Sequence, residues 1–210
     1  MKKFAILGAS GHGKVLAEIA ELSGWTDIVF FDDAWPTLIQ NGPWPISGNS
    51  QHLESSTSQF GGIIVAIGNN AIRLAKSEEI RAKGLPLITL IHPKAIVSHY
   101  ATIDNGSVVM AGAVINPFAK IGFAAIINTS ATIDHDCRLG DGVHVSPGAH
   151  LAGDVSVGHR TWIGIGAVIK QCLQIGEDAT VGAGAAVVND IPNHQTIVGV
   201  PGKERSQYDK

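Results

Sequence analysis

Aliphatic residues recur at every sixth position along the second half of the chain. Each such position from Ile91 to Val187 holds Ile, Val or Leu. A small residue usually stands four positions later, as at Ala113 and Ala131, and glycine often follows directly, as at Gly122 and Gly140. A period of six fits neither an α-helix nor an ordinary β-strand, whose side chains repeat every 3.6 and 2 residues. It is typical of a parallel β-helix in which three hexads, about 18 residues, form one triangular turn.

The pattern also predicts a role for each position of the hexad. We expect the aliphatic side chain to fill the interior of the prism and the small residue to let the chain turn a corner. Glycine is expected to supply backbone freedom at that corner. The β-helix should span residues 91–191, because the period fails beyond Asp190. Residues 192–210 should form a tail that caps the open end.

The first 90 residues follow a different pattern, in which apolar strands alternate with amphipathic helices. Strands are expected at 3–7, 28–31, 63–67 and 87–90, with helices at 14–22 and 71–83. The stretch 34–60, rich in Pro, Ser and Gly, should be irregular. This alternation predicts a small α/β domain over residues 1–90, a Rossmann-like half domain with a parallel sheet.

Composition limits the classes of partner. The chain has 210 residues, 16% of them charged, and a net charge of −3, which argues against nucleic acid or an anionic membrane as partners. No apolar run approaches the roughly 18 residues of a membrane span. Gly8 interrupts the apolar start too early for a signal peptide. We therefore expect a cytoplasmic protein whose two cysteines are reduced.

A glycine-rich loop follows the first predicted strand and precedes a helix. It reads Gly8-Ala-Ser10-Gly11-His12-Gly13, with Ser10 in place of the middle glycine of the dinucleotide fingerprint G-x-G-x-x-G. The domain is also only half the size of a full dinucleotide fold, so NAD is disfavoured. Backbone N–H groups at such a helix start still favour phosphate.

Two further loops are expected at the same edge of the sheet. Asp32 and Asp33 end the second strand, and Gly68 follows the third. These loops predict a crevice that binds the nucleotide part of a ligand, with the carboxylates accepting hydrogen bonds from a ribose or a base. The alternative is that they form only tight turns and a helix cap.

The most polar part of the repeat surrounds one histidine. His135 lies between Asp134 and Asp136, two residues after an interior aliphatic position, so it should point outward. A neighbouring carboxylate favours the imidazolium and orients the ring, which gives a general base near neutral pH. A solvated surface histidine is the alternative. His144 is a candidate for a ligand or subunit contact. The His and Cys spacings match no zinc pattern, and no metal is expected.

Motifs over the whole chain resemble the NeuD/PglD-type sugar acetyltransferases. They are Gly8–Gly13, Phe31–Asp33, Ala66–Asn70, Ile91–Pro93, Asn128–Ser130, Asp134–Asp136, His144–Ala149 and Val198–Lys203. The resemblance implies a left-handed parallel β-helix, a homotrimer and acetyl-CoA as co-substrate. It also implies transfer of acetyl to the 4-amino group of a nucleotide-linked sugar, with UDP favoured, in bacterial surface glycan or glycoprotein sugar synthesis. Other members of the family use GDP- or dTDP-linked sugars, or O-acetylate sialic acid.

The resemblance also assigns roles to individual residues. It makes His135 the general base and Asp136 its acidic partner, where many relatives have the longer Glu. Residues implied in acetyl-CoA binding are Asn128, His144, Ile165, Gly182 and Ala183; Ala183 replaces a glycine of some relatives, so only its backbone contacts transfer. Residues implied in nucleotide-sugar binding are Ser10, Gly11, His12, Asp32, Asp33 and Gly68. The amine should attack the thioester directly, because no cysteine stands beside His135 as a nucleophile. A sugar O-acetyltransferase and a non-catalytic sugar-nucleotide-binding protein remain the alternatives.

Overall fold

A computed structural model of the chain describes residues 3–56 and 59–205. It divides the chain into two compact units, Met1–Pro93 and Lys94–Lys210. The last five residues of the predicted tail 192–210 lie outside the described residues. Within the described ranges, no helix is both long enough and apolar enough to cross a bilayer.

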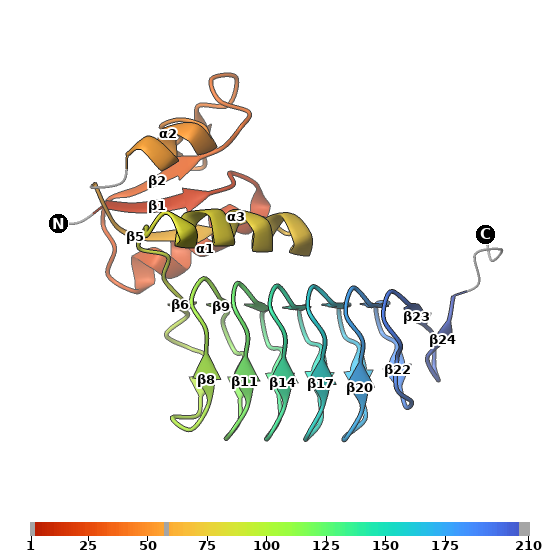
Figure 1. The fold of residues 1–210 in the computed structure, drawn as a ribbon. Coiled ribbons are helices and arrows are strands. Elements are labelled where there is room, and N and C mark those ends of the chain that lie inside the picture. Colours follow the sequence, from red (N-terminus) through yellow and green to blue (C-terminus); the bar gives the residue numbers. More distant parts are fainter. Residues whose placement is uncertain (1–2, 57–58, 206–210) are drawn as a thin grey trace. The chain divides into compact units, whose positions relative to one another are not determined.

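The N-terminal unit is built on a three-stranded parallel sheet. Its main elements are β1 (Lys3–Leu7), α1 (Gly11–Leu22), β2 (Ile28–Phe31), β5 (Phe60–Val65) and α3 (Asn70–Ala82). The strand order β2-β1-β5 places β1 in the centre (Figure 1). Phe4, Ile6 and Phe30 are completely buried because a parallel sheet is covered on both faces. The predicted small parallel sheet is confirmed.

Three details of this unit differ from the sequence prediction. Helix α1 begins at Gly11 rather than near Lys14, so Gly11 and His12 belong to its first turn. The segment predicted to be irregular contains the hairpin β3 (Gln40–Asn41) and β4 (Trp44–Pro45) and the helix α2 (Ser50–Ser55). The predicted fourth strand is reduced to one bridge between Leu87 and Ile63, followed by the short β6 (Leu90–Ile91).

The C-terminal unit is a parallel β-helix of two-residue strands. The strands of its six-stranded sheet are β7 (Ile96–Val97), β10 (Val114–Ile115), β13 (Thr132–Ile133), β16 (His150–Leu151), β19 (Val168–Ile169) and β22 (Ala186–Val187). Those of its five-stranded sheet are β8 (Thr102–Ile103), β11 (Lys120–Ile121), β14 (Arg138–Leu139), β17 (Ser156–Val157) and β20 (Gln174–Ile175). Its third sheet contains β9 (Val108–Val109), β12 (Ile126–Ile127), β15 (His144–Val145), β18 (Trp162–Ile163), β21 (Thr180–Val181), β23 (Thr196–Val198) and β24 (Lys203–Glu204). Strands β7 to β22 pair in parallel register with the strand one turn away, as Val114 does with Thr132, so the predicted β-helix is confirmed (Figure 1). β24 instead pairs antiparallel with β23.

Two residues of each hexad fill the interior. The repeated aliphatic residues and the residues four positions after them form one continuous core, in which Ile133, Ala113 and Ala131 are fully buried. The small residues therefore lie in the core and not at the corners, where the sequence interpretation expected them. Three of these core positions hold the larger Val143, Val155 and Leu173 instead.

Backbone freedom is needed at a different position from the one predicted. The third residue after each interior aliphatic residue, from Gly106 to Gly184, has a positive φ, even where it is Asp136 (61°) or Phe118 (64°). The glycine directly after the aliphatic residue has an ordinary φ, but a Cβ there would strike the next turn. At Gly158 that Cβ would lie 2.4 Å from the backbone nitrogen of Glu177. These glycines therefore allow close stacking of the turns.

The prism continues past the point where the period changes. Ile191 bridges Ile175 and Ile197 pairs with Val181, and both are buried. Residues that bond across this last turn are 16 rather than 18 apart, as in the hydrogen bond from the N–H of Glu177 to Asn193. The last turn is therefore two residues shorter than the others, and the β-helix continues through it.

The buried aliphatic row predicts a large asymmetry between interior and outer positions. Ile133→Ala should lower the free energy of unfolding by about 2–5 kcal/mol, because it leaves a cavity in a close-packed core. Thr102→Ala, at an exposed outer position, should change it by less than about 0.5 kcal/mol. Urea unfolding followed by circular dichroism measures both values. Equal stability of the two variants would contradict this packing.

Candidate functional site

His135 occupies a corner of the prism between β13 and β14. The left-handed backbone of Asp136 turns the chain there, and Nδ1 of His135 lies 2.8 Å from Oδ2 of Asp136. Asp134 Oδ1 accepts hydrogen bonds from the backbone N–H of His135 and from Nδ2 of Asn116, both at 2.8 Å. Hydrogen bonds of both Asp134 and Asp136 therefore fix the turn that carries His135.

The electrostatics of this corner favour a basic imidazole. The hydrogen bond to Asp136, with the nearby carboxylates of Asp134 and Asp154, raises the pKa of His135 above its ordinary value. A neutral ring that donates from Nδ1 to Asp136 carries its lone pair on Nε2. The His135 side chain is 59% exposed, so the ring is accessible to a substrate. The arrangement supports proton abstraction by Nε2.

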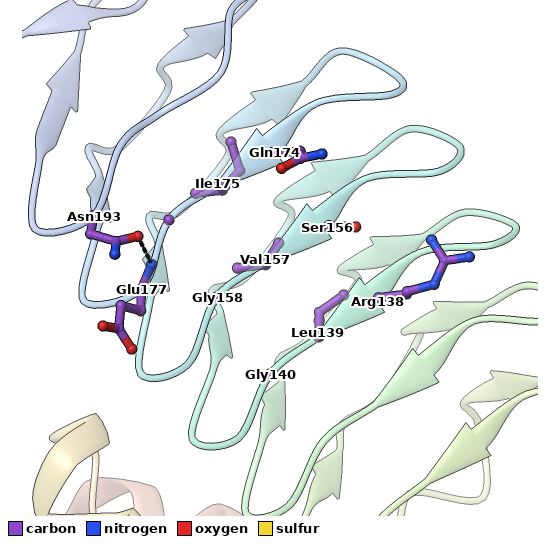
Figure 2. Close-up of a pocket in the computed structure, with 11 residues that line it drawn as sticks. Arg138, Leu139, Gly140, Ser156, Val157, Gly158, Gln174, Ile175, Glu177 and Asn193 are labelled. Carbon is purple, nitrogen blue, oxygen red and sulfur yellow. Dashed lines mark hydrogen bonds between the residues drawn. The ribbon is translucent and has the colours of Figure 1, made fainter.

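Two shallow depressions mark the outer faces of the prism. The smaller, about 420 Å³, lies on the six-stranded sheet. Asn116 and Asp134 line it, so it borders the corner that carries His135. The larger, about 570 Å³, lies on the five-stranded sheet, where Arg138, Ser156 and Gln174 project from successive strands (Figure 2). No predicted site residue lines the larger depression.

A second polar group lies on the third sheet. Nδ2 of Asn128 is 3.1 Å from Nε2 of His144, and the ring of Trp162 follows one turn later, 6.4 Å from the His144 ring between centroids. Nε1 of Trp162 donates to Oγ of Ser146 at 2.6 Å. The structure thus brings together Asn128 and His144, which the sequence assigned to the acetyl end of acetyl-CoA. His135 stands at another corner of the prism.

The residues assigned to the rest of acetyl-CoA gather at one corner. Ile165 and Ala183 occupy equivalent positions one turn apart, and the N–H of Gly184 donates to the carbonyl of Ile165 at 2.8 Å. Ile165 is 56% exposed. A Cβ on Gly182 would lie 2.8 Å from Cγ1 of Val198, so this glycine is needed for packing.

The acidic residues after β2 hold the loops of the N-terminal unit together. Asp32 accepts from the backbone N–H groups of Ala9 (2.7 Å) and Ala34 (2.9 Å). Oδ1 of Asp33 accepts from the N–H (2.9 Å) and hydroxyl (2.7 Å) of Ser50, which lowers the pKa of Asp33. Among the described residues, Oδ2 of Asp33 accepts no hydrogen bond and is available to a ligand. Ser10 is the N-cap of α1, but its side chain makes no capping hydrogen bond.

A buried arginine supports the same loops. Arg73, 1% exposed, donates from Nη1 to the carbonyls of Ile67 and Gly68, both at 3.1 Å, and from Nη2 to Oδ1 of Asn70 at 2.9 Å. Burial lowers the pKa of Arg73 to about 9. Nε2 of His12 is buried nearby and has no hydrogen-bond partner in the described part of the chain. Burial, and then the charge of Arg73, lower the pKa of His12 to about 4.

Sequence reasoning missed several of these supporting residues. Arg73 lies on a predicted helix and was not singled out. Asn116 and Trp162 lie one turn of the prism away from the residues they support. The spacing of 18 residues between Asn116 and Asp134 was the available signal.

One group of potential metal ligands exists among the described residues. Glu177, Asp178 and His194 converge, but both carboxylate oxygens of Asp178 are bonded to the guanidinium of Arg160, at 2.6 and 2.8 Å. A cation would compete with that pair.

The state of His12 predicts acid sensitivity. A histidine whose pKa is about 4 in the folded chain and about 6.5 when unfolded binds its proton in the unfolded state first. Stability should therefore fall as the pH drops from about 6.5 to about 4, by at most about 3 kcal/mol. His12→Gln should flatten that dependence. Urea unfolding followed by the fluorescence of Trp25, Trp35 and Trp44 measures the slope for both proteins, and identical slopes would contradict this role.

Comparisons with known proteins agree with both units. Residues 3–80 match the family model of the PglD N-terminal domain. Over 114 residues the chain is 38% identical to the UDP-N-acetylbacillosamine N-acetyltransferase of Bacillus subtilis, a match that covers 53% of this chain and 52% of that protein. The matched region therefore spans about half the length of this curated relative.

Solved structures match almost the whole chain. The acetyltransferase domain of PglB from Neisseria gonorrhoeae, in complex with acetyl-coenzyme A, is 46% identical with a TM-score of 0.93, over 97% of this chain and 99% of that one. PerB from Caulobacter crescentus, in complex with CoA and GDP-perosamine, is 38% identical with a TM-score of 0.93, over 98% of each chain. The chain belongs to the NeuD/PglD-type family of left-handed β-helix sugar acetyltransferases.

Proposed function

We propose that the protein transfers acetyl from acetyl-CoA to the 4-amino group of a nucleotide-linked 4-amino-4,6-dideoxy sugar. The observation that carries this proposal is the exposed His135, whose Nδ1 lies 2.8 Å from Oδ2 of Asp136. Relatives crystallised with acetyl-CoA, or with CoA and GDP-perosamine, support the co-substrate and the class of acceptor. We place the reaction in the cytoplasm and in the synthesis of surface glycans or glycoprotein sugars.

The mechanism is direct transfer. The sugar amine attacks the thioester carbonyl, and Nε2 of His135 takes the amine proton as the tetrahedral centre forms. The C–S bond then breaks, and the imidazolium returns the proton to the CoA sulfur. Asp136 stabilises the imidazolium through Nδ1. Holding both substrates in one cleft makes the attack effectively intramolecular.

The other predicted residues divide between the two substrates. Asn128, His144, Ile165, Gly182 and Ala183 bind acetyl-CoA. The loops of the N-terminal unit bind the nucleotide sugar through Ser10, Gly11, His12, Asp32, Asp33 and Gly68. Asp33 supports this division best, because its Oδ2 is available to a ribose or a base.

The nucleotide is the point on which the relatives differ. Similarity to the Bacillus subtilis enzyme favours a UDP-linked sugar, and similarity to PerB favours GDP. We favour UDP. An acceptor screen with acetyl-CoA, read by release of free thiol, tests UDP-, GDP- and dTDP-linked 4-amino sugars beside free sialic acid. Turnover with an amino sugar supports N-acetylation. Turnover with sialic acid alone would make the protein an O-acetyltransferase, and no turnover with any acceptor would support a non-catalytic binding protein.

Loss of the proposed base should abolish most of the activity. His135→Ala is expected to lower kcat by about 10²–10⁴-fold, the usual contribution of a general base. The exposed side chain makes few contacts, so the melting temperature should stay close to that of the parent. Equal turnover by variant and parent at saturating substrate would remove His135 from the mechanism.

The acidic partner should set the pH dependence. His135 must be deprotonated to act, and its raised pKa shifts the rising limb of the pH–rate profile toward higher pH. Asp136→Asn keeps a hydrogen-bond acceptor and removes the negative charge. The limb should therefore move to lower pH, with a smaller loss of kcat than in His135→Ala. An unmoved limb would show that Asp136 does not tune the base.

We also propose a C₃ homotrimer with active sites shared between chains. Flat prism faces can pack in parallel about a three-fold axis, and His135 stands at a different corner from Asn128 and His144. Light scattering should give three times 21.9 kDa. Mixing inactive His135→Ala chains with inactive Ile165→Trp chains should restore activity, since some interfaces combine intact halves. If no mixture recovers activity, each site is built from one chain.

A further inference from the structure

Gly153 lies directly against the imidazole of His135. A Cβ built on Gly153 would be 2.5 Å from Nε2, 2.6 Å from Cε1 and 3.2 Å from Cδ2 of His135. Atoms in contact normally stay about 3.5 Å apart, so no side chain fits at residue 153 while the ring holds this position. Gly153 is itself buried.

The backbone does not explain this glycine. Gly153 is not among the residues with positive φ; Asp154 holds the left-handed position of this corner, with φ 57°. An alanine at position 153 would therefore meet no backbone strain. What requires glycine here is the space that the imidazole occupies.

The ring has few other restraints. Among the described residues, its side chain forms one hydrogen bond, from Nδ1 to Asp136, and more than half of the side chain is exposed. The turn beneath is firmly attached, because the N–H of Asp154 donates to the carbonyl of His135 at 2.9 Å and Cys172 N–H donates to the Gly153 carbonyl at 2.9 Å. Asp136 therefore fixes one edge of the ring, and the backbone of Gly153 fixes the Nε2 edge.

We propose that Gly153 is a positioning residue for the acetyl transfer. The space left by its missing side chain, which we call the seat, holds the imidazole of His135 and sets the direction of Nε2. This inference rests on the proposed role of His135 as the base. A methyl group at position 153 would push the ring off its seat and move the nitrogen that takes the amine proton. It would also loosen the contact between Nδ1 and Asp136.

A double-mutant cycle tests the seat. Gly153→Ala in the parent should lower kcat by about 10–100-fold, since a displacement of about 1 Å can cost that much, while KM for acetyl-CoA stays near the parent value. The rising limb of its pH–rate profile should also move to lower pH. In the His135→Ala background, Gly153→Ala should cause no further loss of residual activity, because the group that it displaces is gone. Gln171→Ala, an exposed residue at the same corner one turn further on, is the control and should behave as the parent.

The same double-mutant cycle tests the proposal even if Gly153→Ala folds poorly. If Gly153→Ala is unstable, the double variant with His135→Ala should recover the melting temperature of His135→Ala, since the smaller residue makes room for the new Cβ. An equal loss of stability in both backgrounds would overturn the proposal, as would parent-like kcat in Gly153→Ala or losses that add in the double variant.

The position of the ring separates this inference from the proposed function. A crystal structure of Gly153→Ala should show the imidazole displaced, and an unmoved ring would overturn the seat whatever the activity. If the ring moves but His135→Ala keeps full turnover, the seat stands and the role of His135 as the base fails.

Discussion

The fixed register of the prism is the constraint on which the rest of the structure depends. Each outer strand bonds to the strand one turn away, as in the hydrogen bonds from Thr132 N–H to the Ala149 carbonyl (3.0 Å) and from Asp134 N–H to the Leu151 carbonyl (3.1 Å). Residues 18 apart therefore lie against one another along each face and corner. Asn116 meets Asp134, and Gly153 meets His135, because no other register satisfies the backbone and keeps the aliphatic row inside.

The two units use charge in opposite ways. At the prism corner, three carboxylates surround an exposed imidazole and raise its pKa, which suits a base that must gain a proton during turnover. In the N-terminal unit, burial and then the charge of Arg73 lower the pKa of His12, which keeps that ring neutral. Burial thus leaves His12 uncharged, and exposure leaves His135 accessible for proton transfer.

The fold could be predicted from the sequence because its signal is repeated and local. Seventeen aliphatic positions at one spacing indicate the interior row. The missed assignments concerned the corner positions and the last turn of the prism, and the boundaries of short elements in the N-terminal unit. The reason for the glycine at position 158 depends on the backbone of Glu177, in the next turn, and no local pattern shows that contact.

The candidate site could be predicted only in part. Asp134, His135 and Asp136 are adjacent in sequence, so their association was visible. Asn116 and Gly153 act through partners one turn of the prism away, which no local pattern shows. Arg73 binds the loop just before its own helix, and the start of α1 at Gly11 depends on the helix as a whole.

The central claim is that Nε2 of His135 takes the proton from the sugar amine. It is tested most directly by a crystal structure of the protein with CoA and the nucleotide amino sugar identified by acceptor screening. The account predicts the amine nitrogen within hydrogen-bond distance of Nε2, about 2.6–3.2 Å, or joined to it by one water. An amine that lies away from His135, against a different basic side chain, would contradict it.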